Sequence, residues 1–278
     1  MVANVPCIAA GAEAQCAHEA RSAVAAAMSA PRIIDAHTHV DEAGLWIDPP
    51  EAILERMDEA GIEKAVIMTY RNAPMPAADD PLEYIAGVTR RHPRLIGFAR
   101  MNPRFGENAV SELERALREL NMKGLKLHPV AYVMPPTAPE VLALIRVAAR
   151  WHAPVLFHCG DEEFTLPFQL AQAAPLVPEA TIILGHMGGY FHVEDAIDAA
   201  RQWPNLVLET SAMPYPRMIK RAVETIGPER VIFASDGPGC DPRIEVEKVR
   251  MAGLTDDQQQ LVFADNIQRL LDSAGRQD

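Results

Sequence analysis

The stretch Arg32–His39 reads RIIDAHTH and indicates the fold, because it is a short apolar run that ends in His37-Thr38-His39. In an open, doubly wound α/β sheet, an early strand is followed by a glycine-rich turn that binds phosphate. No such turn follows here. Similar largely apolar runs, typical of parallel strands buried on both faces, recur at intervals of about 25 to 31 residues. After Arg32–Ala36 they are Lys64–Tyr70, Leu95–Arg100, Gly124–His128, Val155–His158, Thr181–Gly185, Leu206–Glu209 and Val231–Ser235.

Amphipathic stretches lie between these runs. Asn108–Leu120 and Pro139–Trp151 carry apolar residues at helical spacing. Eight strands alternating with helices over about 250 residues are typical of a (β/α)8 TIM barrel. We therefore predict an α/β protein with one barrel domain over residues 31–278, including a C-terminal helix. The alanine-rich residues 1–30 are expected to form a helical or disordered extension, and Met28 is an alternative natural start.

The composition excludes several classes of protein. The chain has 278 residues, of which 49% are hydrophobic, and a net charge of −12. Without a basic cluster, a nucleic acid is not expected as a partner. No run of 18 apolar residues is present, so no membrane span is expected. The four cysteines form no CxxC motif and no export signal precedes them, which indicates reduced thiols in a cytoplasmic protein.

Polar residues follow the strands at the end where a barrel builds its active site. His37 and His39 end the first predicted strand, and alternate positions place both imidazoles on one side. His158 ends the fifth predicted strand, His186 follows the sixth, and Asp236 follows the eighth. Neutral imidazoles and a carboxylate are ligands for zinc or a similar divalent ion. The set predicts a metal site at this end of the barrel.

The same order of residues resembles the amidohydrolase superfamily, on the branch that includes aminocarboxymuconate-semialdehyde decarboxylase and resorcylate decarboxylases. The resemblance covers about residues 32–272 and rests on five motifs: Ile34–His39, Gly124–Pro129, Gly185–Gly189, Asn205–Ser211 and Ala264–Leu271. It implies one divalent metal ion, with zinc as the first expectation and manganese or cobalt as the alternatives. It also implies that the metal ligands are His37, His39, His158 and Asp236.

The resemblance further implies that His186 acts on the substrate, while Asp236 transfers a proton. Lys126 and His128 share one side of the fourth predicted strand and are expected to contact substrate. In some superfamily members a carboxylated lysine bridges two metals, and that alternative stays open for Lys126.

Three further residues stand at the ends of the second and third predicted strands. Tyr70, Arg71 and Arg100 are expected to bind substrate, the two arginines through a substrate carboxylate. Glu209 could hydrogen-bond a ligand or support the site.

The leading hypothesis is a hydrolase that attacks a small carboxylated amide, lactone or related carbonyl compound with metal-activated water. The alternative is a metal-dependent, non-oxidative decarboxylase of a small aromatic or unsaturated acid. A barrel that has lost catalysis and serves as a scaffold is a third hypothesis. The resemblance also implies a homodimer.

Overall fold

The computed structural model describes residues 31–43, 47–75 and 79–276. The chain divides into two units, Met1–Pro31 and Arg32–Asp278. The predicted extension over residues 1–30 lies outside the described residues. No helix among the described residues is long and apolar enough to cross a membrane.

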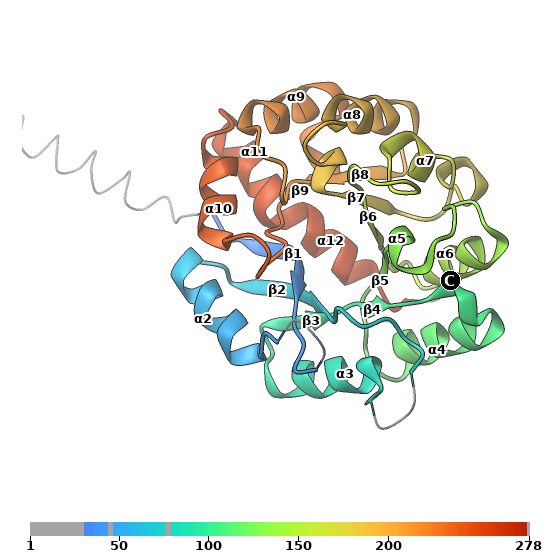
Figure 1. Cartoon of the computed structure of the whole chain (residues 1–278). Helices are drawn as coiled ribbons and strands as arrows, with labels where there is room; N and C mark the ends of the chain where they lie inside the picture. Colours follow the sequence, from blue (N-terminus) through green and yellow to red (C-terminus); the bar gives the residue numbers. More distant parts are fainter. Residues whose placement is uncertain (1–30, 44–46, 76–78, 277–278) are drawn as a thin grey trace, which may run out of the picture. The chain divides into compact units, whose positions relative to one another are not determined.

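The predicted strands form a parallel (β/α)8 barrel (Figure 1). The strands are β1 (Ile34–His39), β2 (Lys64–Met68), β3 (Leu95–Gly97), β4 (Ala99–Arg100), β5 (Leu125–Leu127), β6 (Val155–His158), β7 (Ile182–Gly185), β8 (Leu206–Glu209) and β9 (Val231–Ile232). The third predicted run is split into β3 and β4 at Phe98. The Phe98 amide donates to the carbonyl of Ile67 in β2. The Ala99 amide instead donates to the carbonyl of Gly124, the residue before β5. The chain thus changes its pairing partner at Phe98.

The first strand also contacts the last segment of the barrel. Ala36 N donates to Phe233 O at 3.2 Å, and Asp236 N donates to His37 O at 2.8 Å. A parallel bridge joins Thr38 to Gly237. These contacts bring the predicted strand-end residues of β1 and of the β9 segment side by side.

Helices follow the strands and surround the barrel, except α12 (Asn266–Ser273), which runs across the middle of the view (Figure 1). They are α2 (Pro50–Ala60), α3 (Pro81–Arg91), α4 (Glu107–Arg118), α5 (Pro129–Tyr132), α6 (Pro139–Arg150), α7 (Pro167–Ala171), α8 (Val193–Gln202), α9 (Pro216–Ile226), α10 (Pro242–Arg250), α11 (Asp256–Gln260) and α12 (Asn266–Ser273). Short 3-10 helices are η2 (Pro103–Phe105), η3 (Ala174–Leu176), η4 (His186–Gly188) and η5 (Pro228–Arg230), and η6 (Leu261–Asp265) is a π-helical segment. Many helices begin at a proline, whose missing N–H costs nothing in the first turn. Gly61, at φ 71°, ends α2 in the left-handed conformation that glycine adopts readily.

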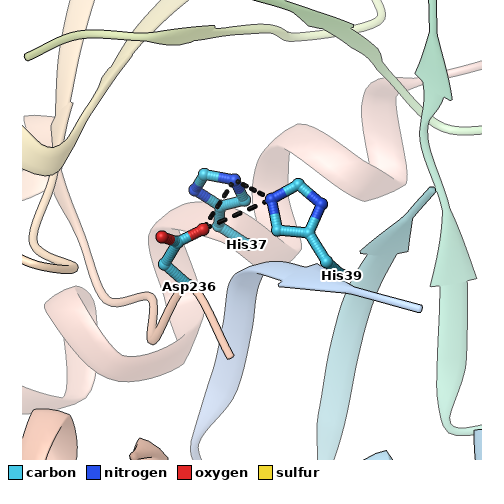
Figure 2. A group of neighbouring side chains, drawn as sticks. All are labelled: His37, His39 and Asp236. Atoms are coloured by element: carbon cyan, nitrogen blue, oxygen red, sulfur yellow. Dashed lines mark hydrogen bonds and ion pairs between the residues drawn. The ribbon is translucent and has the colours of Figure 1, made fainter. Parts of the chain in front are cut away.

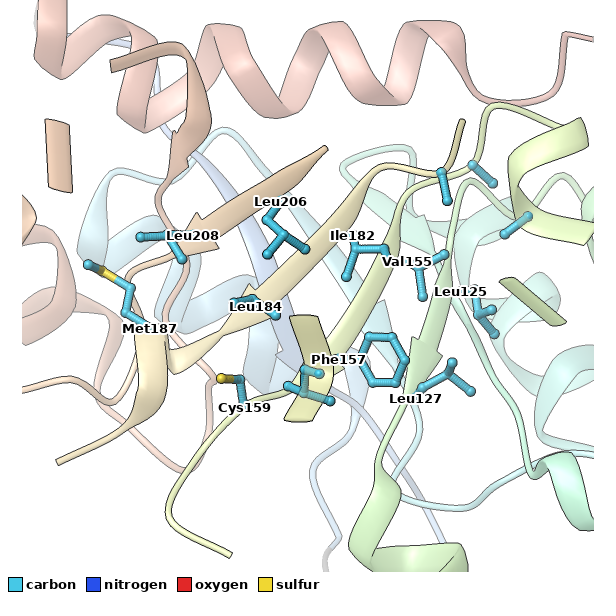
Figure 3. Packing of buried hydrophobic residues seen from close by; sticks show 14 of the residues in the cluster. Leu125, Leu127, Val155, Phe157, Cys159, Ile182, Leu184, Met187, Leu206 and Leu208 are labelled. Atoms are coloured by element: carbon cyan, nitrogen blue, oxygen red, sulfur yellow. The ribbon is translucent and has the colours of Figure 1, made fainter. Parts of the chain in front are cut away.

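Both faces of the sheet are buried, which explains why the strands read as continuous apolar runs. One set of side chains, including Phe157 and Leu184, packs in the cluster that also holds the helix residues (Figure 3). The alternate set, including Ile34, Leu156 and Val207, fills the barrel interior together with residues of α12. The polar strand-end residues continue this interior set.

Candidate metal centre and active site

A β-bulge in β1 directs its two histidines into the barrel. Ile34 and Ala36 belong to the interior cluster, so strict alternation would send His37 and His39 to the other face. The pairing register with β2 shifts between Asp35 and Thr38. Such a shift re-aims the following side chains. As a result, both imidazoles lie inside the barrel and face one another.

Three predicted ligands form a compact triangle (Figure 2). His37 Nε2 and His39 Nε2 are 3.2 Å apart, and each lies 3.3 Å from Asp236 Oδ1. Ligand atoms 2.0–2.1 Å from a tetrahedral ion would be about 3.3–3.4 Å apart, and about 3.0 Å apart around an octahedral ion. The observed spacing therefore fits a divalent metal ion.

The protonation states of these residues suit metal binding. Burial lowers the pKa of His37 to about 3, with the charge of Lys126 acting in the same direction, so its imidazole is neutral. Burial by itself would raise the pKa of Asp236, but the nearby imidazoles of His37, His186 and His39 hold it well below its usual range. A neutral imidazole and an ionised carboxylate are the forms that bind metal.

Glu209 orients His37 from behind. Its Oε2 lies 3.2 Å from His37 Nδ1, and its side chain is fully buried. This contact places the imidazole proton on Nδ1 and leaves the Nε2 lone pair for a metal. Oε2 also accepts from the His186 amide at 3.2 Å, and Oε1 accepts from the Ser211 amide at 2.5 Å. Glu209 therefore supports the site, which is one of the two roles predicted for it.

His186 lies beside this triangle. Its ring centroid is 5.2 Å from that of His37, and its Nδ1 lies 2.9 Å from Ser211 Oγ. His186 and Asp236 both have positive φ, 65° and 58°, which is uncommon for residues other than glycine. Strain of this kind persists only where surrounding contacts fix the backbone.

The fourth predicted ligand, His158, lies outside the triangle. Its Nδ1 is 3.1 Å from His186 Nε2, and its Nε2 is 3.4 Å from Glu162 Oε2. Its ring also stacks on His128, with centroids 4.2 Å apart. The metal-binding role of His158 stays a prediction.

The predicted substrate-binding residues differ in their surroundings. Lys126 is buried and its Nζ lies 2.7 Å from His37 Nε2. Burial lowers the pKa of Lys126 to about 7. Tyr70 stacks on His39, with ring centroids 4.5 Å apart. Arg71 instead forms a bidentate contact with the buried carboxylate of Asp41, which already occupies its guanidinium.

Three residues for which no role was predicted from the sequence support the site. Asp35 is fully buried and accepts from the amides of His37 and Ser235, and so ties β1 to the β9 segment. Ser211 holds His186, and Asn72 accepts from Arg100. A charged residue inside an apolar run was the signal available for Asp35. Ser211 and Asn72 lie in loops, where one sequence carries no signal of their contacts.

Comparison with known proteins identifies the family. The family model described as Amidohydrolase matches residues 34–272. The chain belongs to the amidohydrolase family. No curated protein sequence matches this amidohydrolase significantly.

Solved structures share the fold of this amidohydrolase at low sequence identity. An uncharacterised TIM-barrel protein from Bordetella bronchiseptica has a TM-score of 0.72 at 19% identity, over 88% of this chain and 100% of that chain. The 5-carboxyvanillate decarboxylase of Sphingomonas paucimobilis has a TM-score of 0.67 at 17% identity, over 87% and 99%. That of Novosphingobium aromaticivorans, complexed with manganese and 4-hydroxy-3-methoxy-5-nitrobenzoic acid, has a TM-score of 0.71 at 15% identity, over 88% and 97%.

Proposed function

We propose that this amidohydrolase is a metal-dependent, non-oxidative decarboxylase of small aromatic acids. The decarboxylases with the same fold match almost the whole barrel, and one of them holds manganese together with an aromatic acid. Decarboxylation, the alternative in the sequence analysis, therefore takes precedence over hydrolysis. The metal is one divalent ion, manganese, zinc or cobalt, held by His37, His39 and Asp236, with His158 as the further ligand.

The observation in the structure that supports a substrate carboxylate at this site is the position of Lys126. Its Nζ is buried 2.7 Å from a metal-ligand atom of His37, and no carboxylate among the described residues forms an ion pair with it. His37 Nε2 is its acceptor here, and a metal on Nε2 would take that lone pair and leave a buried donor that is costly unless a ligand satisfies it. A substrate carboxylate placed over the triangle would accept a hydrogen bond from Lys126.

The residues of this site can divide the reaction between them. When bound, the metal supplies positive charge that orients and polarises the substrate. His186, fixed by Ser211, donates a hydrogen bond to the substrate carboxylate. Asp236, whose carboxylate is ionised, can relay a proton from solvent, because its side chain is 24% exposed whereas that of His37 is fully buried.

The bond changes balance without water or an oxidant. The bond between the ring carbon and the carboxyl carbon breaks, and its electron pair stays on the ring carbon. Asp236 accepts a proton from solvent and passes it to that carbon as CO₂ leaves, and the Asp236 carboxylate is then ionised again.

Isotope labelling tests this proposal. Protein loaded with Mn²⁺, Zn²⁺ or Co²⁺ would be incubated in D₂O, and in parallel in H₂¹⁸O, with a panel of hydroxybenzoic acids that carry one or two carboxylates. A panel of amides and lactones would be treated in the same way. We expect one CO₂ per product, one deuterium at the vacated ring carbon, and no ¹⁸O in the product. Turnover of amide or lactone substrates with ¹⁸O incorporation, and no CO₂ from any acid, would instead establish the hydrolase.

Asp236→Asn and Glu140→Gln provide the matched pair of variants. Asp236→Asn removes the proton carrier and is expected to abolish turnover. Glu140 lies exposed in the first turn of α6, so Glu140→Gln should keep full activity.

A further inference from the structure

Arg100 is a buried cation without a carboxylate partner. Its side chain lies at the end of β4, and the residue is only 7% exposed. Arg100 Nε donates to Asn72 Oδ1 at 3.0 Å and Nη1 donates to Thr69 O at 3.4 Å, so neutral oxygens contact two of the three guanidinium nitrogens. Across the described ranges, no acceptor contacts its Nη2 and no carboxylate forms an ion pair with it.

Arg71, in contrast, has a structural role and is paired with a carboxylate. Its guanidinium contacts both oxygens of Asp41, with the nearest pair 2.9 Å apart. Arg100 has no equivalent of Asp41, and burial lowers its pKa to about 10. Since an unpaired buried charge destabilises a protein, Arg100 is expected to have a partner that the chain itself does not provide.

The strand register places Arg100 beside the proposed reaction site. Arg100 on β4 is the direct pairing partner of Lys126 on β5. Paired residues of adjacent parallel strands project from the same face, so both cations lie on the inner wall of the barrel. The Tyr132 hydroxyl in α5, the helix after β5, is also buried without a partner among the described residues. Burial raises the pKa of Tyr132, and the positive charge of Arg100 opposes this shift.

From this arrangement we infer that Arg100 binds a second carboxylate of the substrate, separate from the carboxylate that is lost. The substrates are then aromatic dicarboxylic acids. The guanidinium fork matches a carboxylate in two parallel hydrogen bonds, which a neutral hydroxyl cannot accept. Asn72 and Thr69 hold the fork in place before substrate arrives. This inference rests on the proposed function, because it assumes that the first carboxylate lies at the metal triangle.

Binding of non-reactive probes tests the inference separately from catalysis. Benzoate, 3-hydroxybenzoate and isophthalate would be titrated by calorimetry into the Mn²⁺-loaded protein. None has a hydroxyl ortho or para to a carboxylate to activate the ring carbon, so the titration measures binding alone. We expect isophthalate to bind at least tenfold more tightly than benzoate, and 3-hydroxybenzoate to bind like benzoate.

Arg100→Met should abolish this preference by weakening isophthalate at least tenfold while benzoate affinity changes less than threefold. Its ligand-free Tm should equal or exceed that of the wild type, because the variant loses an unpaired buried charge. Arg100→Lys keeps the charge without the fork and should retain part of the preference, which covers the case in which Arg100→Met fails to fold. Arg146→Met, at an exposed position on α6, is the matched control and should keep the full preference.

Three results would overturn the inference. Equal affinity of the wild type for benzoate and isophthalate would show that no second carboxylate is bound. An unchanged preference in Arg100→Met would assign that carboxylate to another residue. A large fall in Tm in Arg100→Met, with equal losses for both probes, would make Arg100 structural. Failure of decarboxylation in the labelling experiment, with the isophthalate preference intact, would reject the proposed function and leave the second-carboxylate site.

Discussion

Glu209→Gln tests the arrangement on which the proposed metal site depends. The carboxylate of Glu209 accepts from three donors: Oε1 from the Ser211 amide, and Oε2 from the His186 amide and from His37 Nδ1. A glutamine of the same shape has only one oxygen and presents two N–H donors on its other side. The substitution therefore keeps the volume and changes the hydrogen bonding.

The expected cost follows from counting these donors. In the better orientation, the amide oxygen faces His37 and His186, and the amide nitrogen then opposes the Ser211 N–H. One buried donor left unsatisfied costs about 1–3 kcal/mol, and two bonds that lose a charged acceptor weaken by about 1 kcal/mol each. Removal of a buried charge offsets part of this loss, so we expect a net destabilisation of about 2–4 kcal/mol. At about 2–4 °C per kcal/mol, Tm should fall by roughly 5–15 °C.

Metal affinity should fall as well, because Glu209 fixes the tautomer of His37. Loss of such a supporting contact weakens metal binding by about 10- to 100-fold. The assay is a competition titration with a chelating indicator, with Tm measured on the same samples and Glu140→Gln as the control. A metal Kd within twofold of wild type together with an unchanged Tm would refute this account of Glu209.

Four further predictions concern ligation, catalysis, pH dependence and the core. His158→Ala should remove most bound metal, measured by elemental analysis after dialysis, and full metal content would reject His158 as a ligand. His186→Asn should retain metal while kcat for decarboxylation falls about 10²- to 10³-fold, and an unchanged kcat would make His186 structural. Burial raises the pKa of Glu245 to about 7 against the charge of Lys248, so the folded chain keeps a proton that the unfolded chain loses between about pH 4.5 and 7. Its contribution to stability therefore declines as pH rises through this window. When the free energy of unfolding in urea is plotted against pH, Glu245→Gln should lack this decline. Phe157→Ala, at a fully buried position, should lower the free energy of unfolding by about 3–5 kcal/mol, and a loss below 1 kcal/mol would contradict the packing described.

The sequence alone determined the barrel and the positions of most site residues. Parallel strands buried on both faces must be continuously apolar, so the repeating runs could be recognised without knowing their neighbours. The point where each run changes to polar residues then located His37, His39, His186 and Asp236. Such signals are local and depend on a few adjacent residues.

Only the tertiary structure decided how these residues meet. The bulge in β1 reverses the alternation that would otherwise send His37 to the helix side, and no composition rule signals it. Glu209 reaches His37 from a strand 172 positions away in the chain. Arg71 and Arg100 are equivalent as strand-end arginines in the sequence. In the structure, Asp41 neutralises Arg71, whereas Arg100 has no such carboxylate among the described residues and contacts Asn72. A side chain's hydrogen-bond partner is set by packing between distant segments, so these assignments required the folded structure.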